Sequence, residues 1–290
     1  MADAARGAPP PRLWLAVVAH PDDETVGLST RLADWSAAAH VLTITDGAPR
    51  DRRTHERHGF ARREDYAAAR VAEQLGALAV VGVAAARCAR LDVVDQETAL
   101  HLPEIARRIA ALVDALSPEV VFTHSYEGGH PDHDAAACAV RLALDLLARD
   151  GASRPALFEF PAYRADVDEV PQLAGPLRPR SQLRPPVPLR FLPGGPAETT
   201  VVLSAADRER KRRMYACYRT QALEGFFPPE VERYRPAPLH DFTRPPHAGL
   251  LHYENHGYEI RGDRFRALCA DARATLLGAG RDSHGSSSRK

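Results

Sequence analysis

The hydrophobic positions of the first 165 residues alternate between two spacings. Short runs in which nearly every position is apolar predict strands buried on both faces, whereas apolar residues three or four apart predict helices. Predicted strands span residues 13–19, 41–45, 78–83, 119–123 and 156–160, and predicted helices span residues 26–35, 61–75, 98–116 and 134–148, with Gly76 ending the second helix. This alternation predicts an α/β, Rossmann-like fold in which a mostly parallel sheet carries helices on both faces.

The C-terminal half has a different pattern because prolines interrupt it. Residues 166–198 contain eight prolines, and residues 225–260 are rich in proline, histidine and aromatics. Between and after them we expect a strand over 199–203 and helices over 205–220 and 261–277. We therefore predict one domain over residues 12–280, with its core over 12–165 and substrate-side insertions over 166–260, and disordered tails at 1–11 and 281–290.

Composition and charge exclude several classes of protein. The 38 Lys and Arg residues balance 38 Asp and Glu residues, so no basic excess supports nucleic-acid binding. The four cysteines include no CxxC pair, which argues against a zinc ribbon or a thioredoxin-like site, and a reducing cytoplasm is the expected location. No apolar run approaches the about 18 residues of a membrane span. Dinucleotide-binding, P-loop and nucleophile-elbow motifs are absent from the sequence.

A first polar cluster follows the first predicted strand. His20, Asp22, Asp23 and Glu24 crowd into five positions where the chain leaves the sheet. Carboxylates this close repel one another unless a proton, a cation or a metal is present, and histidine with carboxylate suits Zn²⁺. Acidic residues also favour the first turn of a helix, which would explain the three carboxylates but not His20.

A second cluster follows the fourth predicted strand. His130 and His133 are three residues apart at the start of a helix, so both rings can reach one point. Asp132 between them can orient one imidazole by accepting its ring N–H. A turn with an Asp cap would explain the neighbouring glycines but not two histidines. If the first and fourth strands are neighbours in the sheet, both clusters meet at the carboxyl edge, where such sheets bind ligands.

The two motifs together resemble those of a known family. Ala-His-Pro-Asp-Asp-Glu at 19–24, with His-Pro-Asp-His at 130–133, is similar to the PIG-L/LmbE family of metal-dependent N-acetylglucosaminyl de-N-acetylases. Thr-Asp-Gly at 45–47 resembles the family as well. The resemblance covers about the first 150 residues. The remainder shows little resemblance, and we expect it to hold the residues that determine substrate preference.

The resemblance implies a role for each polar residue. His20, Asp23 and His133 become the metal ligands, Asp22 the general base, and His130 the group that stabilises the oxyanion. Two histidines and one carboxylate that leave a position open form a catalytic zinc pattern, so Zn²⁺ is expected, with Fe²⁺ or another divalent metal as the alternative. In this scheme a protonated His130 faces the developing charge, and a bell-shaped pH profile follows.

The resulting functional prediction is a zinc-dependent hydrolase that removes an N-acetyl group from an N-acetylglucosamine-type amino sugar on a small molecule or natural product. One alternative is an amidase that cleaves another small-molecule amide, such as a thiol conjugate. The other is a non-catalytic, metal-containing ligand-binding module, although a structural site has no use for Asp22 beside its ligands. The expected partner is the small-molecule substrate, without nucleic acid or a membrane span, and a homo-oligomer is possible.

Other polar residues are expected to have simpler roles. The arginines of residues 50–63 are predicted to form a solvated loop, with contact to a sugar hydroxyl or an anionic group as the alternative. His124 is expected to stay outside the set of metal ligands. Loop or surface positions are expected for His240, His247, His252 and His256.

Overall fold

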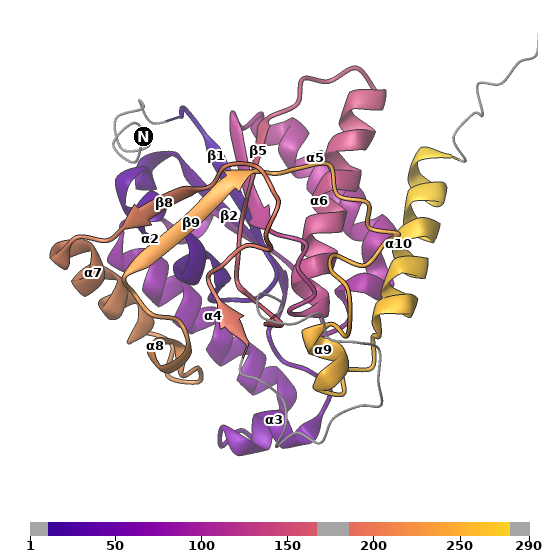
Figure 1. Ribbon diagram of the computed structural model, residues 1–290. Coiled ribbons are helices and arrows are strands. Elements are labelled where there is room, and N and C mark those ends of the chain that lie inside the picture. The colour runs from indigo at the N-terminus through magenta and orange to yellow at the C-terminus, as the bar shows by residue number, and fades with distance from the viewer. Residues whose placement is uncertain (1–10, 167–185, 279–290) are drawn as a thin grey trace, which may run out of the picture.

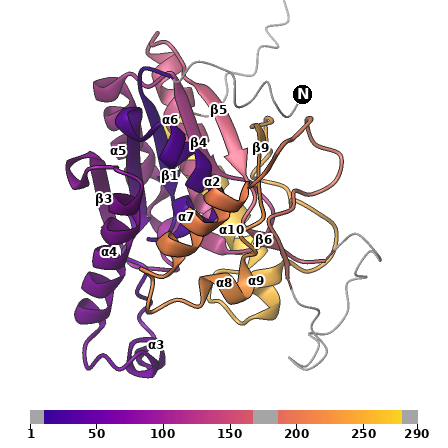
Figure 2. The ribbon, with the colours of Figure 1, turned by 90° about the vertical axis from the view of Figure 1, so that its left-hand side faces the viewer.

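The computed structural model describes residues 11–166 and 186–278 and is shown from two sides in Figure 1 and Figure 2. The predicted disordered tails lie outside these residues, apart from residue 11, and so does most of the proline-rich segment that begins at residue 166. The predicted domain limits therefore stay predictions.

A seven-stranded sheet forms the centre of the described chain, in the order β3-β2-β1-β4-β5-β9-β8. Neighbouring strands from β3 to β5 are parallel, whereas β9 is antiparallel to both β5 and β8. This confirms the predicted mostly parallel sheet. The strands are β1 (Trp14–Val18), β2 (Ala39–Thr45), β3 (Cys88–Val93), β4 (Val120–His124), β5 (Ala156–Phe160), β8 (Thr199–Val202) and β9 (Val231–Pro236), and a separate small sheet pairs β6 (Tyr163–Arg164) with β7 (Val187–Pro188).

Helices cover both faces of the sheet, as Figure 1 shows, with α2, α4 and α7 on one face and α5, α6 and α10 on the other. The α-helices are α2 (Asp23–Asp34), α3 (Arg52–Arg57), α4 (Arg63–Val80), α5 (Leu102–Leu116), α6 (Pro131–Arg149), α7 (Ala205–Tyr215), α8 (Leu223–Phe226), α9 (His252–Asn255) and α10 (Gly262–Leu277). Short 3₁₀ turns are η1 (Ser36–Ala38), η2 (Ala85–Arg87) and η3 (Thr98–His101).

The central strand β1 explains why the sheet is buried on both faces. Leu15 and Val17 belong to the apolar core beneath α5, α6 and α10, whereas Trp14, Ala16 and Val18 belong to the core beneath α2, α4 and α7. Alternate side chains of a strand point to opposite faces, so an uninterrupted apolar run supplies both cores. Burial of both faces thus accounts for the apolar run from which this strand was predicted.

The prediction for the segment between α4 and β3 was wrong. Helix α4 does not end at Gly76 but continues to Val80, and the predicted strand over residues 78–83 does not form. Gly76 lies inside the helix and does not end it. A Cβ added at Gly76 would be in ordinary van der Waals contact with Cys217. The third strand is β3, an edge strand with exposed Arg90 and Asp92, and it lacks the apolar run that identified its neighbours.

The C-terminal half contains more regular structure than predicted. The expected strand near residue 199 is confirmed as β8, and the final helix is confirmed as α10. Strand β9 and helix α9 lie where only loops were expected, because β9 alternates charged and apolar residues and has proline at its end. Helix α7 ends at Tyr215, five residues before its predicted end.

The sheet order brings the two polar clusters together. Strands β1 and β4 are hydrogen-bonded neighbours, with Trp14 opposite Val120 and Ala16 opposite Phe122. The loops that follow them therefore leave the sheet at the same carboxyl edge, near α3 and α9 at the lower end of Figure 1. None of the helices in the described ranges is both long and apolar enough to cross a lipid bilayer.

Candidate metal centre

Three of the predicted site residues face one another at the carboxyl ends of β1 and β4. His20 Nδ1 lies 3.1 Å from His133 Nε2 and 3.3 Å from Asp23 Oδ2. His133 Nε2 lies 3.3 Å from Asp23 Oδ1. All three side chains are buried. The structure thus brings together, from two distant segments, the atoms that the resemblance implies as metal ligands.

Helix α6 positions the second cluster. It begins at Pro131, earlier than predicted, because proline suits the first helical position and His130 caps the helix by accepting the Asp132 N–H at Nδ1. His133 follows within the first turn and points to the same site as His130, with 5.2 Å between the ring centroids. The spacing of three residues therefore directs both rings toward one point, as predicted.

Two carboxylates hold the opposite edge of the His20 ring. Asp95 Oδ1 lies 3.1 Å from His20 Nε2, and Asp132 Oδ2 lies 3.4 Å from the same nitrogen. Asp132 also accepts the backbone N–H groups of Gln96 and Thr98, which fixes its position. The contact with His20 agrees with the prediction that Asp132 orients an imidazole. Asp95 was missed, because the strand before it, β3, was placed too early in the sequence.

The donor set fits a divalent cation. The carboxylates beside His20 Nε2 favour a proton on that nitrogen, which leaves the Nδ1 lone pair directed toward His133 and Asp23. Burial alone would lower the pKa of His20, yet the charges of Asp95 and Asp23 raise it well above its ordinary value. Burial would raise the pKa of Asp23, but the imidazoles of His133, His124 and His20 hold it well below its usual range. Both shifts mean that the carboxylates here stabilise positive charge on this group of side chains, and a bound metal ion would supply that charge in place of a proton.

His124 lies closer to this centre than predicted. Its ring stacks on that of His133, with centroids 4.2 Å apart, and its Nε2 lies 3.2 Å from Asp23 Oδ2. The same nitrogen lies 3.1 Å from the N–H of Ala19, which it can accept only when it carries no proton. The atoms of Asp23, His124 and His133 are close enough to share an ion. The signal in the sequence was its position at the last residue of β4.

Asp22 and Arg70 form a buried ion pair beside the cluster. Arg70 Nη2 donates to Asp22 Oδ2 at 3.0 Å, and both side chains are at least nine-tenths buried. Burial raises the pKa of Asp22, and the charge of Arg70 opposes this rise. The predicted base is thus close to the ligands in the chain and in space, with a cation that favours its ionised form.

The surroundings of His130 bear on its predicted protonation. Its Nδ1 accepts the Asp132 N–H, and a ring nitrogen that accepts a hydrogen bond carries no proton of its own. Burial lowers the pKa of His130 well below its ordinary value, and the neighbouring His20 and His133 add to this effect. The ring packs edge-on against Tyr258, with centroids 4.9 Å apart. The hydrogen bond and the lowered pKa both favour a neutral ring, whereas the resemblance implies an imidazolium, so the protonation state of His130 stays a prediction.

A cavity of about 440 Å³ reaches the cluster at Asp95. Arg50 and Arg53 line its outer wall, and Arg50 pairs with Glu97, which lines the same cavity. The arginine-rich segment at residues 50–63 therefore contains helix α3, where a solvated loop was predicted. Its residues Arg50 and Arg53 border the cavity beside the site. Arg63 at the start of α4 instead pairs with Asp46.

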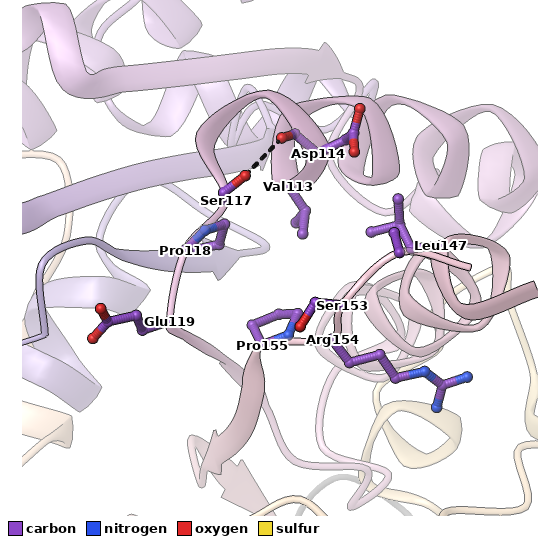
Figure 3. Close-up of a pocket in the computed structure, with 10 residues that line it drawn as sticks. Val113, Asp114, Ser117, Pro118, Glu119, Leu147, Ser153, Arg154 and Pro155 are labelled. Carbon is purple, nitrogen blue, oxygen red and sulfur yellow. Dashed lines mark hydrogen bonds between the residues drawn. The ribbon is translucent and has the colours of Figure 1, made fainter. Parts of the chain in front are cut away.

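A second cavity, of about 350 Å³, lies at the opposite edge of the sheet, where β4 and β5 begin. Figure 3 shows Ser117, Glu119 and Pro155 on its walls. No histidine lines it, and Arg154 on its rim pairs with Asp145. This cavity is therefore separate from the candidate centre.

One of the C-terminal histidines, His252, was wrongly expected at a loop or surface position, whereas His240 lies in a loop as expected. His252 is buried and packs edge-on against Tyr163, whose ring in turn contacts His133. His240 lies 2.7 Å from the buried carboxylate of Glu159. His247 and His256 are less buried and lie in loops, as expected.

Comparisons with known proteins relate part of the chain to a family of de-N-acetylases. Residues 15–144 match the family model described as "PIG-L: GlcNAc-PI de-N-acetylase". Over 202 residues the chain is 33% identical to the 1D-myo-inositol 2-acetamido-2-deoxy-alpha-D-glucopyranoside deacetylase of Kineococcus radiotolerans, covering 58% of this chain and 54% of that protein. The chain therefore spans about half the length of this curated relative.

Solved structures show the same fold at low sequence identity. The A40926 pseudoaglycone deacetylase Dbv21 matches with a TM-score of 0.55 and 20% identity, over 78% of this chain and 96% of that chain. The zinc-inhibited form of the teicoplanin deacetylase Orf2 matches with a TM-score of 0.54 and 18% identity, over 76% and 96%. These likenesses confirm the α/β, Rossmann-like fold.

Proposed function

Because residues 15–144 match the PIG-L family model, we propose that this chain is a metal-dependent hydrolase that removes the N-acetyl group from an N-acetylglucosamine-type amino sugar on a small molecule or natural product. The observation that carries the proposal is the convergence of His20, Asp23 and His133 within 3.3 Å of one another, beside the Asp22 carboxylate. The relative from Kineococcus, named as a deacetylase of an acetamido sugar, supports the substrate class.

In this proposal His20, Asp23 and His133 hold the metal. Two imidazoles and one carboxylate favour Zn²⁺, and Fe²⁺ has the same donors available. The ion would polarise the acetyl carbonyl and lower the pKa of a nearby water molecule. Asp95 would fix the orientation of His20 through its Nε2, as carboxylates do for metal-binding histidines.

Asp22 and His130 would carry the proton transfers. Asp22, ionised beside Arg70, accepts a proton from the attacking water and can return one to the leaving amine. His130 presents its Nε2–H to the site and can donate a hydrogen bond to the oxyanion without first gaining a proton. The resemblance implies a protonated ring for this role, and we propose the neutral ring of the same residue instead.

The cavity beside Asp95 would admit the substrate. It is lined by Asp95, which contacts His20, and by residues of α3 and the start of α10, so a sugar bound there would lie next to the cluster. Its walls carry both Arg53 and Glu259, which suits a polyhydroxylated group that both donates and accepts hydrogen bonds.

We also propose a cytoplasmic location. The thiols of Cys88, Cys138, Cys217 and Cys269 are all free. Free thiols are the rule in reducing compartments, where disulfides rarely persist.

The proposal is tested by measuring bound metal and acetate release on N-acetylglucosamine and its methyl glycosides. Asp22→Asn is expected to keep its metal and lose at least about 100-fold in kcat, whereas His133→Ala is expected to lose both metal and turnover. Asp34→Asn, at the exposed end of α2, and His101→Ala, at an exposed position before α5, are the matched controls and should behave like the wild type.

The outcomes separate the competing functions. Normal turnover by Asp22→Asn would show that the assigned base is wrong. If the metal-loaded wild type released nothing from acetylated sugars but cleaved other small-molecule amides, the chain would be an amidase of a different class. If it cleaved no amide while still binding the sugars, it would be a ligand-binding module.

A further inference from the structure

The guanidinium of Arg70 joins two loops at the carboxyl edge of the sheet. Arg70 lies in the middle of α4, and its Nη2 donates to Asp22 Oδ2 at 3.0 Å in the loop after β1. Its Nη1 donates to the carbonyl oxygen of Gly47 at 2.8 Å in the loop after β2. The side chain of Arg70 is 6% exposed and that of Asp22 10%. A rigid, planar group thus holds the carboxylate at a fixed place relative to the backbone.

The Asp22 carboxylate is held by little else. Asp22 occupies the N-cap position of α2, yet its side chain makes no capping hydrogen bond. Within residues 11–166 and 186–278, Arg70 is the residue that donates a hydrogen bond to this carboxylate. An Asp at an N-cap ordinarily turns back to its own helix. Arg70 therefore holds Oδ2, and no residue of the described ranges donates a hydrogen bond to Oδ1.

Gly47 makes room for this contact. Its φ of +67° lies in the left-handed region, and an added Cβ would lie 3.0 Å from Arg70 Cζ and 2.8 Å from Pro21 Cδ. A side chain at this position would push against the guanidinium and against the proline next to Asp22. The three segments can therefore approach one another closely because position 47 is a glycine and the buried residue between them is Arg70.

We infer that Arg70 is a positioning residue for the proposed hydrolysis, because it fixes the Asp22 carboxylate so that its second oxygen can meet the attacking water. This inference rests on the proposed function, in which Asp22 is the base. Misplacing a reacting group by about 1 Å costs on the order of 100-fold in rate. Arg70 contacts none of the proposed metal ligands by hydrogen bond, so its removal should affect turnover rather than metal retention.

The test uses the full chain loaded with Zn²⁺ and measures acetate release from the methyl glycosides of N-acetylglucosamine. Arg70→Ala is expected to retain zinc, to keep KM within about threefold and to lose about 10- to 100-fold in kcat. Added guanidinium or ethylguanidinium should restore part of kcat in Arg70→Ala and should not stimulate the wild type. Arg70→Lys keeps the positive charge but cannot donate to Asp22 and Gly47 with the planar geometry of a guanidinium, so it should lose several-fold in kcat. It replaces the alanine variant in the test if that variant does not fold.

A buried ion pair elsewhere provides the control. Lys211 on α7 donates to Glu232 on β9 at 2.9 Å, and both side chains are fully buried away from the metal cluster. Lys211→Met should lower the melting temperature and leave kcat near the wild-type value. A purely structural Arg70 would give the same result as this control.

The outcomes distinguish the inference from the function on which it rests. If Asp22→Asn loses turnover while Arg70→Ala and Arg70→Lys keep wild-type kcat, the positioning role is overturned and the function stands. Loss of zinc together with kcat in both Arg70 variants would also overturn it, because Arg70 would then support the metal cluster itself. If Asp22→Asn turns over normally, the proposed function loses its base and the inference falls with it.

Discussion

His20 Nε2 lies 3.1 Å from Asp95 Oδ1, although the two residues are 75 positions apart in the chain. The contact is made at the carboxyl edge of the sheet, between the loop after β1 and the loop after β3. Since the other ring nitrogen of His20 faces His133 and Asp23, this carboxylate determines how the ring presents its lone pair to the cluster.

Asp95→Asn is therefore expected to weaken metal binding. An amide in place of the carboxylate removes the charge that favours a proton on Nε2, and losing such a partner ordinarily costs about 10- to 100-fold in metal affinity. Competition with a chromogenic zinc chelator measures the change. Asp51→Asn is the control, because Asp51 lines the same cavity without contacting His20. Unchanged zinc affinity in Asp95→Asn would show that Asp132 alone orients the ring.

A buried carboxyl group in the loop after β4 should make stability depend on pH. Burial raises the pKa of Glu127 to about 8, although its hydrogen bonds from Ser125 and the Ala162 N–H oppose the rise. The folded state then holds a proton that the unfolded chain releases near its ordinary pKa. The contribution of Glu127 to stability is thus complete below about pH 4.5 and is lost as the pH rises through about 8.

The expected slope for one such group is up to about 1.4 kcal/mol per pH unit within that window. Urea unfolding at pH 5.5, 7.0 and 8.5 measures it, and Glu127→Gln should flatten the decline because a neutral amide replaces the neutral acid. Glu104→Gln, on the exposed face of α5, should leave the decline unchanged. A wild-type slope identical to that of Glu127→Gln would contradict the raised pKa.

The sequence predicted the sheet and the two histidine clusters because both depend on local patterns. Strands β1 and β4 are buried on both faces, so their apolar runs were visible, and the residues that follow such strands had to meet at one edge. The predicted convergence of His20 and His133 needed only that these strands be neighbours, and they are.

The missed features depend on contacts between distant segments. Strand β3 lies at the edge of the sheet and β9 carries charged residues, so neither shows an apolar run, and Asp95 was lost with β3. Arg70 was not singled out from the sequence, because its burial follows from loops that are distant in the chain and pack over it. No local spacing distinguishes such an arginine from one in solvent.

Gly129 should be intolerant of substitution because another segment passes close to it. A Cβ added at Gly129 would overlap the backbone carbonyl oxygen of Tyr163, which cannot move as a flexible side chain could. Because Gly129 immediately precedes His130, the displacement would be transmitted to the start of α6. Gly129→Ala is expected to lower the free energy of unfolding by more than about 2 kcal/mol and to reduce zinc content.

Gly225 in α8 provides the matched control, since nothing lies within 4 Å of its added Cβ. Alanine there should be neutral or slightly stabilising, because it reduces the freedom of the unfolded chain. Urea unfolding and metal analysis of both variants check the pair. Equal stability of Gly129→Ala and Gly225→Ala would mean that the loop before His130 can yield, and that the close approach of Tyr163 does not fix the position of this histidine.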